Sequence, residues 1–253
     1  MNKKSKNIIL GLIIPMCILI LWHLAKTKTD ISSAILPNIS DVIKSFISQI
    51  KSGQLFRDLS TSLGRVLKGY IVAALLGVTL GTIMGMSKKI NSIFSLTLNI
   101  IRQIPMMAWI PLIILWCGIG ETSKVVIIVL GAFFPIMVNT ISGIQSTPKG
   151  YIELSQLYKL SKWRTFIKVY LPSALPQIFV GLKLGLGISW MAVVAAELVA
   201  ATSGIGFRIS DARSLMQPDV VIVGMIVIGI IGILMDKILV LIGKRVTPWI
   251  NKK

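Results

Sequence analysis

The sequence VVIIVLGAFFPIMVNTISGI occupies residues 125–144, and the equally apolar QIFVGLKLGLGISWMAVVAAELVA occupies residues 177–200. Between them lies a polar, basic segment that begins TPKGYIELS at residues 147–155 and ends at Leu171-Pro172. A helix needs about 20 mostly apolar residues to cross a bilayer, and both flanking stretches are long enough. The polar segment therefore predicts a structured element outside the bilayer, and such an element needs a partner there.

The composition of the 253-residue chain indicates an integral membrane protein. Apolar residues make up 54% and charged residues 14%, and the mean hydropathy is +0.82, whereas soluble domains carry about 25% charged residues. The formal net charge of +18 comes from Lys and Arg that lie between and beside hydrophobic segments. There they contact anionic headgroups and set topology, so we expect membrane lipid rather than nucleic acid as their partner.

The sequence offers no pattern for a metal or redox centre. The two cysteines, Cys17 and Cys117, fall inside apolar segments, and the single histidine, His23, ends the first of these segments. A zinc site needs several converging His, Cys or carboxylate ligands. We therefore expect no cofactor on this chain, and the same lack of a converging constellation disfavours a membrane-embedded enzyme.

About six stretches satisfy the length requirement for a spanning helix. We place them near residues 8–24, 66–86, 104–117, 125–144, 177–200 and 220–242. No small-x-small cleavage site follows the first stretch, which favours its retention as a transmembrane helix. Lys and Arg are more frequent in the segments that share the N-terminus's side of the membrane than in those on the opposite side. Because these residues favour the cytoplasmic side, both termini are predicted to be cytoplasmic.

The segment from Lys26 to about Arg65 is predicted to be structured on the outer side. Ser40-Asp41 can cap a helix with apolar residues at helical spacing, and Gly53 can end it. A second amphipathic stretch then runs into the second span. These features divide the chain into an N-terminal helix with an outer amphipathic segment (1–65), a transmembrane domain (66–245) and a cytoplasmic tail (246–253).

The polar segment, a loop of about 146–176, predicts a short helix-turn-helix. Thr147 suits an N-cap and Pro148 a first helical position, for a helix over 149–158. Ser161 can cap a second helix, which Pro172 and Pro176 are expected to stop. The apolar and aromatic side chains of this element can fill a partner's groove, or they can rest on the headgroups, and the pattern alone favours neither.

The spacing in this segment resembles the EAA motif of permease subunits of bacterial ATP-binding-cassette importers. That motif reads Glu-Ala-Ala, three residues, Gly, nine residues, Ile-x-Leu-Pro. Here Glu153 begins the pattern, Lys159 replaces the Gly, and Leu171-Pro172 ends it, with Leu-Ser for Ala-Ala and Val for Ile. The Gly suits a left-handed residue after the first helix. A lysine there costs about 1 kcal/mol, or the helix must end differently.

The resemblance extends over about residues 36–245. Its further motifs lie at residues 104–112, 118–121, 131–135, 196–198 and 203–206, and they are similar to the subgroup that serves nitrate, taurine and aliphatic sulfonates. Close relatives of that subgroup carry riboflavin or thiamine precursors, which leaves an alternative substrate class. The implied fold is an all-α membrane protein with about six transmembrane helices in the type I importer, MetI-like permease architecture.

In such importers two permease copies pair, here as an expected homodimer in the bacterial plasma (inner) membrane. Each copy docks a cytoplasmic ATPase subunit, and an external substrate-binding protein delivers the solute. The chain has no phosphate-binding Gly-x-x-x-x-Gly-Lys-[Ser/Thr] loop, so the permease is not expected to be an enzyme and ATP is used by the partner. The residues expected to couple the two subunits are Glu153, Leu154, Ser155, Lys159, Trp163, Leu171 and Pro172.

The residues considered for a translocation pathway are Arg102, Gln103, Pro105, Trp109 and Glu197. An arginine at the centre of a membrane costs at least about 2.5–3.5 kcal/mol, which suggests that Arg102 lines an anion pathway. Alternatively, Arg102 extends to the inner interface and the third span starts after it. Glu197 has two open roles as well: a pathway residue, or a capping and packing residue near the outer end of the fifth span.

An ion-coupled secondary carrier is the alternative of a different class. It predicts paired carboxylates within the spans and requires no docking loop. The few acids within the predicted spans, such as Glu197 and Asp236, lie near the ends, which disfavours this alternative.

Overall fold

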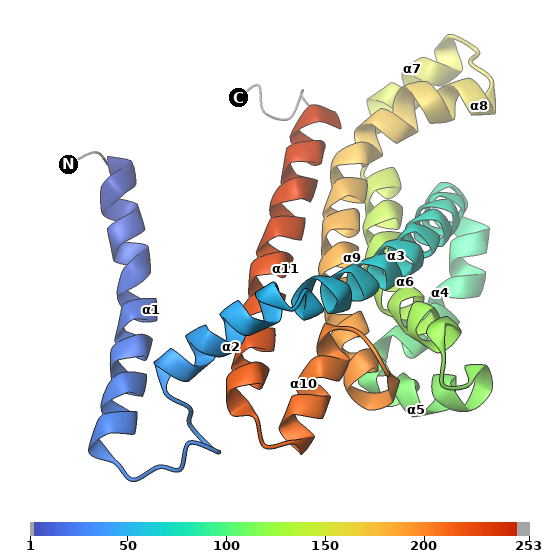
Figure 1. The fold of residues 1–253 in the computed structure, drawn as a ribbon. Helices are drawn as coiled ribbons and strands as arrows, with labels where there is room; N and C mark the ends of the chain where they lie inside the picture. Colours follow the sequence, from blue (N-terminus) through green and yellow to red (C-terminus); the bar gives the residue numbers. More distant parts are fainter. Residues whose placement is uncertain (1–2, 247–253) are drawn as a thin grey trace.

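The computed structural model describes residues 3–246, and this part of the chain contains helices and no strand. Figure 1 shows their arrangement. The helices are α1 (Lys3–Lys28), α2 (Ile39–Lys51), α3 (Gln54–Met86), α4 (Lys88–Gln103), α5 (Met106–Cys117), α6 (Glu121–Gln145), α7 (Lys149–Leu157), α8 (Lys162–Thr165), the π-helical η1 (Phe166–Tyr170), α9 (Leu171–Ala200), α10 (Ile205–Ser214) and α11 (Pro218–Val246). The tail predicted at 246–253 lies outside the described residues except for Val246.

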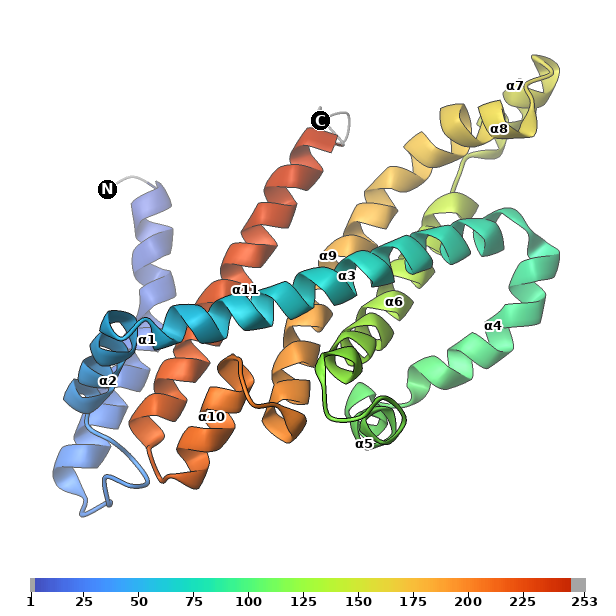
Figure 2. The same cartoon turned by 45° about the vertical axis from the view of Figure 1, so that its right-hand side comes forward.

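The centre of the bundle is α6, which packs against α3 on one side and α9 on the other (Figure 2). Glycines allow this close packing around Ile136, which is fully buried. A Cβ added to Gly77 of α3 would lie 2.9 Å from Ile136 Cγ2, and one added to Gly185 of α9 would lie 2.7 Å from Ile136 Cδ1. Because lipid is as apolar as a side-chain core, close packing of small residues replaces the hydrophobic effect in holding such helices together.

Five helices are long and apolar enough to cross a membrane: α1, α3, α6, the helix from Lys162 to Ala200, and α11. A sixth span forms if α4 and α5, which meet at an angle of 97°, are counted together. The predicted third span at 104–117 is therefore wrong in extent, because α5 has only 12 residues and the crossing begins with α4. The polar residues along α4 interrupt its apolar residues, so the hydrophobic pattern did not predict this helix. Its N-cap is Ser87, whose Oγ accepts from the N–H of Ile90 at 3.3 Å.

The two ends of the bundle are distinct in both ribbon views. The start of α1, the end of α11 and the α7–α8 hairpin lie toward one end, whereas α2, α5 and α10 lie toward the other (Figures 1 and 2). The first turn of α1 and the last turn of α11 therefore share the side of the α7–α8 hairpin, as the predicted even number of crossings requires. We call this side the α7–α8 end and the opposite side the α10 end.

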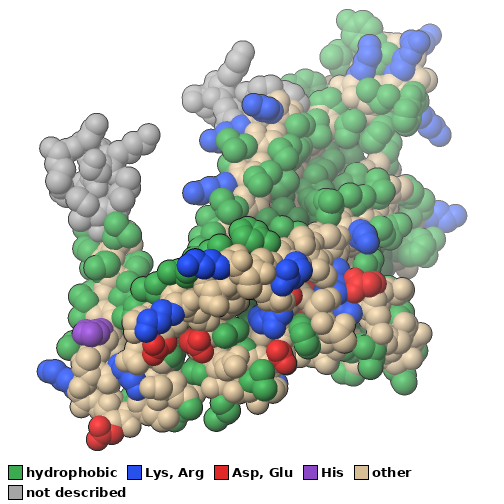
Figure 3. Space-filling view, viewed as in Figure 1, with side chains coloured by type: hydrophobic (Ala, Val, Ile, Leu, Met, Phe, Trp, Pro, Cys, Tyr) green, Lys and Arg blue, Asp and Glu red, His purple; other side chains and the backbone are tan. Residues whose placement is uncertain are grey.

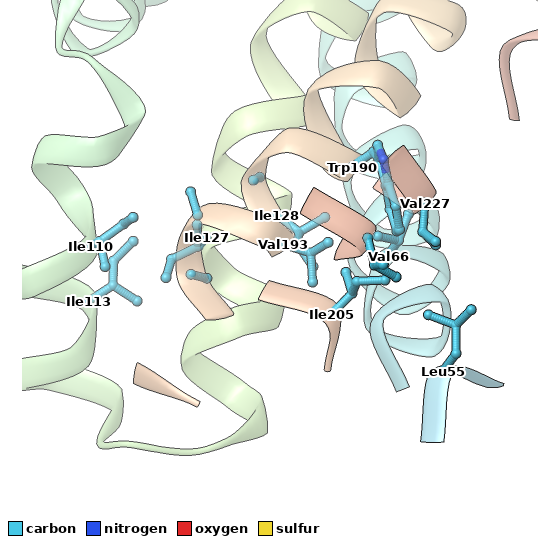
Figure 4. Close-up of a cluster of buried hydrophobic side chains, with 14 of the residues drawn as sticks. Leu55, Val66, Ile110, Ile113, Ile127, Ile128, Trp190, Val193, Ile205 and Val227 are labelled. Carbon is cyan, nitrogen blue, oxygen red and sulfur yellow. The ribbon is translucent and has the colours of Figure 1, made fainter. Parts of the chain in front are cut away.

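Hydrophobic side chains cover much of the visible surface, Lys and Arg appear in both its upper and its lower half, and the acidic side chains lie in the lower half (Figure 3). Near the α10 end, a buried cluster joins α3, α5, α6, α9, α10 and α11 (Figure 4). Its labelled members are Leu55, Val66, Ile110, Ile113, Ile127, Ile128, Trp190, Val193, Ile205 and Val227. This cluster fixes the elements that carry the polar groups described below.

The helices of the outer segment follow the prediction with one change at the cap. Asn38, not Ser40-Asp41, is the residue before α2, and its Nδ2 donates to Asp41 Oδ2 at 2.9 Å. Gly53 separates α2 from α3 with a φ of +69°, a conformation that glycine adopts at low cost. The second amphipathic stretch continues into the second span as expected, since α3 is one helix of 33 residues.

Candidate functional site

The helix α7 ends as the motif's glycine position requires, although the residue there is a lysine. Lys159 is left-handed, with a φ of +47°. Its N–H donates to the Gln156 carbonyl at 2.9 Å, and the next N–H, of Leu160, donates to the Ser155 carbonyl at 3.0 Å. This pair of bonds is a Schellman motif. Of the two alternatives left open for Lys159, the structure therefore has the left-handed lysine.

Two sequence features beside α7 have different outcomes. The predicted N-cap role of Thr147 is wrong: Pro148 precedes α7, and the buried Thr147 Oγ1 has no hydrogen-bond partner among the described residues. The cap predicted at Ser161 is confirmed, because its Oγ accepts from the N–H of Arg164 at 3.4 Å.

The second arm of the hairpin does not stop at the prolines. One helical path of 39 residues runs from Lys162 to Ala200, so the expected stop at Pro172 and Pro176 is wrong. Pro172 lies in the first turn of α9, where the missing N–H is tolerated. The π-helical turn Phe166–Tyr170 precedes it and places the Leu171 N–H on the Phe166 carbonyl. The hairpin is therefore continuous with a spanning helix.

The outer surface of the hairpin is apolar and exposed. Leu157, Tyr158 and Trp163 are 79%, 73% and 68% exposed, and the rings of Trp163 and Phe166 lie 5.8 Å apart. Glu153 is exposed and makes no hydrogen bond or ion pair with the described residues. A cluster of large exposed apolar residues next to an unpaired acid is typical of a protein contact surface.

A groove of about 630 Å³ lies on the inner side of this hairpin, between α7 and the start of α9. Of the residues predicted to couple the subunits, Leu154, Ser155 and Pro172 line it. Glu153, Lys159 and Trp163 lie outside it on the exposed surface. Leu171 is half-buried and packs against the cluster of Ile144, Ala174 and Ile178.

A second cavity, of about 390 Å³, lies where the bend between α4 and α5 faces α6 and α9. We call it the α4–α5 cavity; its lining is Ile101, Arg102, Ile104, Pro105, Met106, Trp109, Leu130, Gly131, Phe134, Pro135, Val138, Asn139 and Ile188. The structure thus brings three of the residues considered for a pathway together, Arg102, Pro105 and Trp109. Gln103 is exposed and does not line the cavity, and Glu197 lies elsewhere.

Glu197 belongs to a buried ionic cluster at the α10 end of the bundle. Its Oε1 accepts from Arg65 Nη1 at 2.6 Å, and both of its oxygens lie 2.9 Å from Ser62 Oγ. Arg65 also forms a bidentate pair with Glu121, at 2.7 and 2.5 Å, and donates to the Ser203 carbonyl at 2.7 Å. The side chains of Arg65 and Glu197 are 4% and 0% exposed, so each charge is neutralised inside the protein.

The same carboxylate also holds the turn before α10. The N–H of Gly206 donates to Glu197 Oε2 at 2.9 Å, and the N–H of Ile205 donates to Ser62 Oγ at 3.0 Å. Gly204 has a φ of +108°, and a Cβ there would lie 2.4 Å from the Glu197 carboxyl group. The cluster thereby ties α3, α6, α9 and the start of α10 together.

Sequence reasoning missed most of this cluster. Arg65 was identified only as a basic residue of the outer segment, Glu121 only as the end of a family motif, and Ser62 was not singled out. The available signal was Glu197 itself, because an acid in an apolar helix requires a partner. The partner was not identifiable, since Arg65 lies 132 residues earlier in the chain.

Comparison with known proteins places this geometry in a family context. Residues 73–252 match the family described as binding-protein-dependent transport system inner membrane component. The chain is 35% identical to SsuC of Bacillus subtilis (strain 168), which is named for aliphatic sulfonates transport, over 99% of this chain and 91% of that protein. It is 35% identical to the taurine transport system permease protein TauC of Escherichia coli (strain K12), over 92% and 86%. It is 36% identical to the nitrate import permease protein NrtB of Leptolyngbya laminosa, over 77% and 70%.

Solved structures share the fold at lower identity. An amino acid ABC transporter chain superposes with a TM-score of 0.65 at 17% identity, covering 79% of this chain and 98% of that one. The MetNI methionine ABC transporter in an inward-facing conformation gives a TM-score of 0.58 at 21% identity, covering 70% and 91%. These similarities confirm the all-helical, MetI-like permease architecture that the sequence motif implied.

Proposed function

We propose that this chain carries a small anion into the cell. The chain belongs to the family of binding-protein-dependent transport system inner membrane components, and it is the permease of an ATP-binding-cassette importer. Sulfonates, taurine and nitrate are the favoured substrates. The names of SsuC, TauC and NrtB support this class, since all three are about one third identical to this chain over most of its length. The strong basic excess of the chain, +18 at neutral pH, is compatible with an anionic solute.

The proposed partners follow from the same family. Two copies of the permease pair in the bacterial plasma membrane, two cytoplasmic ATPase subunits dock on them, and an external binding protein delivers the anion. The permease itself binds no cofactor, and ATP is hydrolysed by the ATPase subunits. The start of α1 and the end of α11 lie at the α7–α8 end of the bundle, and we propose that this end faces the cytoplasm, where the ATPase is.

The observation that carries the proposal is the continuity between the α7–α8 hairpin and a spanning helix. An exposed apolar surface at Leu157, Tyr158 and Trp163 offers a docking site for the ATPase. The helical path from Lys162 to Ala200 connects that surface to the interior of the bundle without a break. Movement of docked ATPase subunits toward each other would therefore move α9, and with it the walls that α9 forms.

Glu153 provides the test. It has no partner among the described residues, so Glu153→Lys removes nothing from the fold of the permease. If Glu153 binds the ATPase, we expect copurification of the ATPase with tagged permease to fall on the order of 30-fold, because an interfacial charge of the wrong sign costs several kcal/mol. ATP-dependent uptake of labelled taurine should fall with it, while the amount of permease in the membrane stays unchanged.

A matched control is Asp30→Lys, which makes the same charge change at an exposed residue far from the hairpin. This variant should retain the ATPase. Normal uptake by Glu153→Lys, or equal loss in both variants, would refute the assignment of the hairpin as the coupling surface.

A further inference from the structure

The α4–α5 cavity combines one cation with an otherwise apolar wall. Its polar groups are the guanidinium of Arg102, the indole N–H of Trp109 and the amide of Asn139. Arg102 forms no ion pair or hydrogen bond with residues 3–246, and the Trp109 N–H donates no hydrogen bond within them. No acidic residue lines the cavity. Its potential is therefore positive, and the unpaired groups of Arg102 and Trp109 are hydrogen-bond donors.

The α6 wall of the cavity lies in the middle of that helix, whereas α5 itself lies toward the α10 end. The α6 wall runs from Leu130 to Asn139, so the wall begins about 13 Å along the helix from Glu121 at 1.5 Å per residue. Arg102 lies about 21 Å along α4 from Lys88, at the same rise. It is therefore remote from Lys88, where the helix pair α4–α5 begins. A phospholipid headgroup resides at the interface, which makes a solute the better candidate for this depth.

The remaining lining sets the shape of the occupant. Asn139 Nδ2 donates to the Pro135 carbonyl at 2.8 Å, which orients the amide and leaves its oxygen free to accept. The rest of the wall is hydrocarbon, thioether and aromatic surface, as in pockets that hold small molecules with few polar contacts. A volume of about 390 Å³ accommodates a compact solute with an anionic head and a short chain.

We infer that the α4–α5 cavity is an anion-recognition site within the permease, in which Arg102 and Trp109 donate to the head of a sulfonate-like anion and the apolar wall contacts its short chain. This inference rests on the proposed function and adds to it a selective step inside the membrane. A chain amine such as that of taurine would find the Asn139 oxygen as its acceptor. Selection by the permease is then separate from selection by the binding protein.

The test uses the assembled transporter in proteoliposomes and measures uptake of labelled taurine, ethanesulfonate and nitrate. Arg102→Gln should lower uptake of all three anions at least about tenfold, because a hydrogen bond to a charged group is lost. Arg102→Lys, which keeps the charge, should retain a larger share of uptake. Trp109→Phe, which removes only the N–H donor, should lower uptake a few-fold. The matched control Arg245→Gln, at an exposed arginine at the end of α11, should leave uptake unchanged.

Each alternative gives a distinct result. Wild-type uptake by Arg102→Gln would overturn the recognition site while leaving the proposed function intact. Absence of ATP-driven uptake of all three anions by the wild type would instead overturn the proposed substrate class. Equal loss in Arg102→Gln and Arg102→Lys together with a lower melting temperature would assign Arg102 a structural role. Loss of uptake by Arg102→Gln only in vesicles of anionic phospholipid would assign the cavity to a lipid headgroup. Either a structural role or a headgroup site would refute the inference.

Discussion

Replacing Glu197 with glutamine should destabilise the bundle although the two side chains have the same shape. The carboxylate is surrounded by donors: Arg65 Nη1 on Oε1, the Gly206 N–H on Oε2, and Ser62 Oγ near both. The Ser62 hydroxyl already accepts from the Ile205 N–H, so its own proton points to Glu197. In either orientation, the NH₂ group of a glutamine would face Arg65 or the Gly206 N–H, and a donor would meet a donor.

The magnitude follows from burial. Removing one partner of a buried ion pair costs about 3–5 kcal/mol, and Arg65 and Glu197 are 4% and 0% exposed. Because Arg65 keeps its bidentate pair with Glu121, we take the lower limit, about 3 kcal/mol. For a chain of this size, each kcal/mol shifts the melting temperature by about 2–4 °C. Glu197→Gln should therefore melt about 6–12 °C below the wild type.

Glu121→Gln is the matched control within the same cluster. It removes a bidentate partner of the same arginine, but the Glu121 side chain is 62% exposed, so water replaces the lost contact. Pairs of this kind contribute at most about 1 kcal/mol, which corresponds to no more than about 4 °C. Melting is followed by intrinsic tryptophan fluorescence of the purified permease in detergent. Equal shifts for the two variants would show that burial does not govern this cluster, and the reasoning would fail.

Two further substitutions test the helix packing and the hairpin turn. Gly81→Ala should cost about 1–3 kcal/mol of stability by overpacking, since its Cβ would lie 2.8 Å from the Met137 carbonyl oxygen. Gly64→Ala in the same helix meets nothing within 4 Å and should be neutral or slightly stabilising. Thermal melting of both variants in detergent measures the difference. Lys159→Gly relieves a left-handed lysine that costs about 1 kcal/mol, but glycine frees the unfolded chain by about 0.5–1 kcal/mol. The net gain is at most about 0.5 kcal/mol, so we expect the melting temperature to rise by no more than about 2 °C with unchanged ATPase copurification. A fall in melting temperature would contradict this.

Local patterns with a single physical meaning were predicted correctly from the sequence. The apolar run 125–144 became α6, Glu121–Gln145, and the polar segment became a hairpin whose first helix, Lys149–Leu157, matches the prediction within one residue. Ser161 caps the second helix. Each of these outcomes depends on interactions within a few residues, which the sequence displays directly.

The errors arose where local signals have more than one structural outcome. A proline ends a helix or begins one, and Pro172 begins α9 because the π-helical turn before it changes the hydrogen-bond register. The helix α4 mixes polar and apolar residues, so a run of apolar residues could not predict it, although it begins the bent α4–α5 pair. The ionic cluster depends on residues 56 and 132 positions apart, and no local pattern encodes such pairings.

The path from Lys162 to Ala200 connects the hairpin surface, the α4–α5 cavity and the ionic cluster. Its first turn carries Trp163 on the proposed coupling surface, its second half carries Ile188 in the wall of the α4–α5 cavity, and its last turn carries Glu197 in the ionic cluster. A helix of 39 residues has a contour length of about 58 Å, enough to join an ATPase outside the bilayer to both. Since Glu197 fixes the far end through buried charge pairs, displacement of the near end must bend or tilt the helix at the level of the cavity. Docking of the ATPase is therefore expected to change the shape of the α4–α5 cavity, because Glu197 holds the far end of the helix in place.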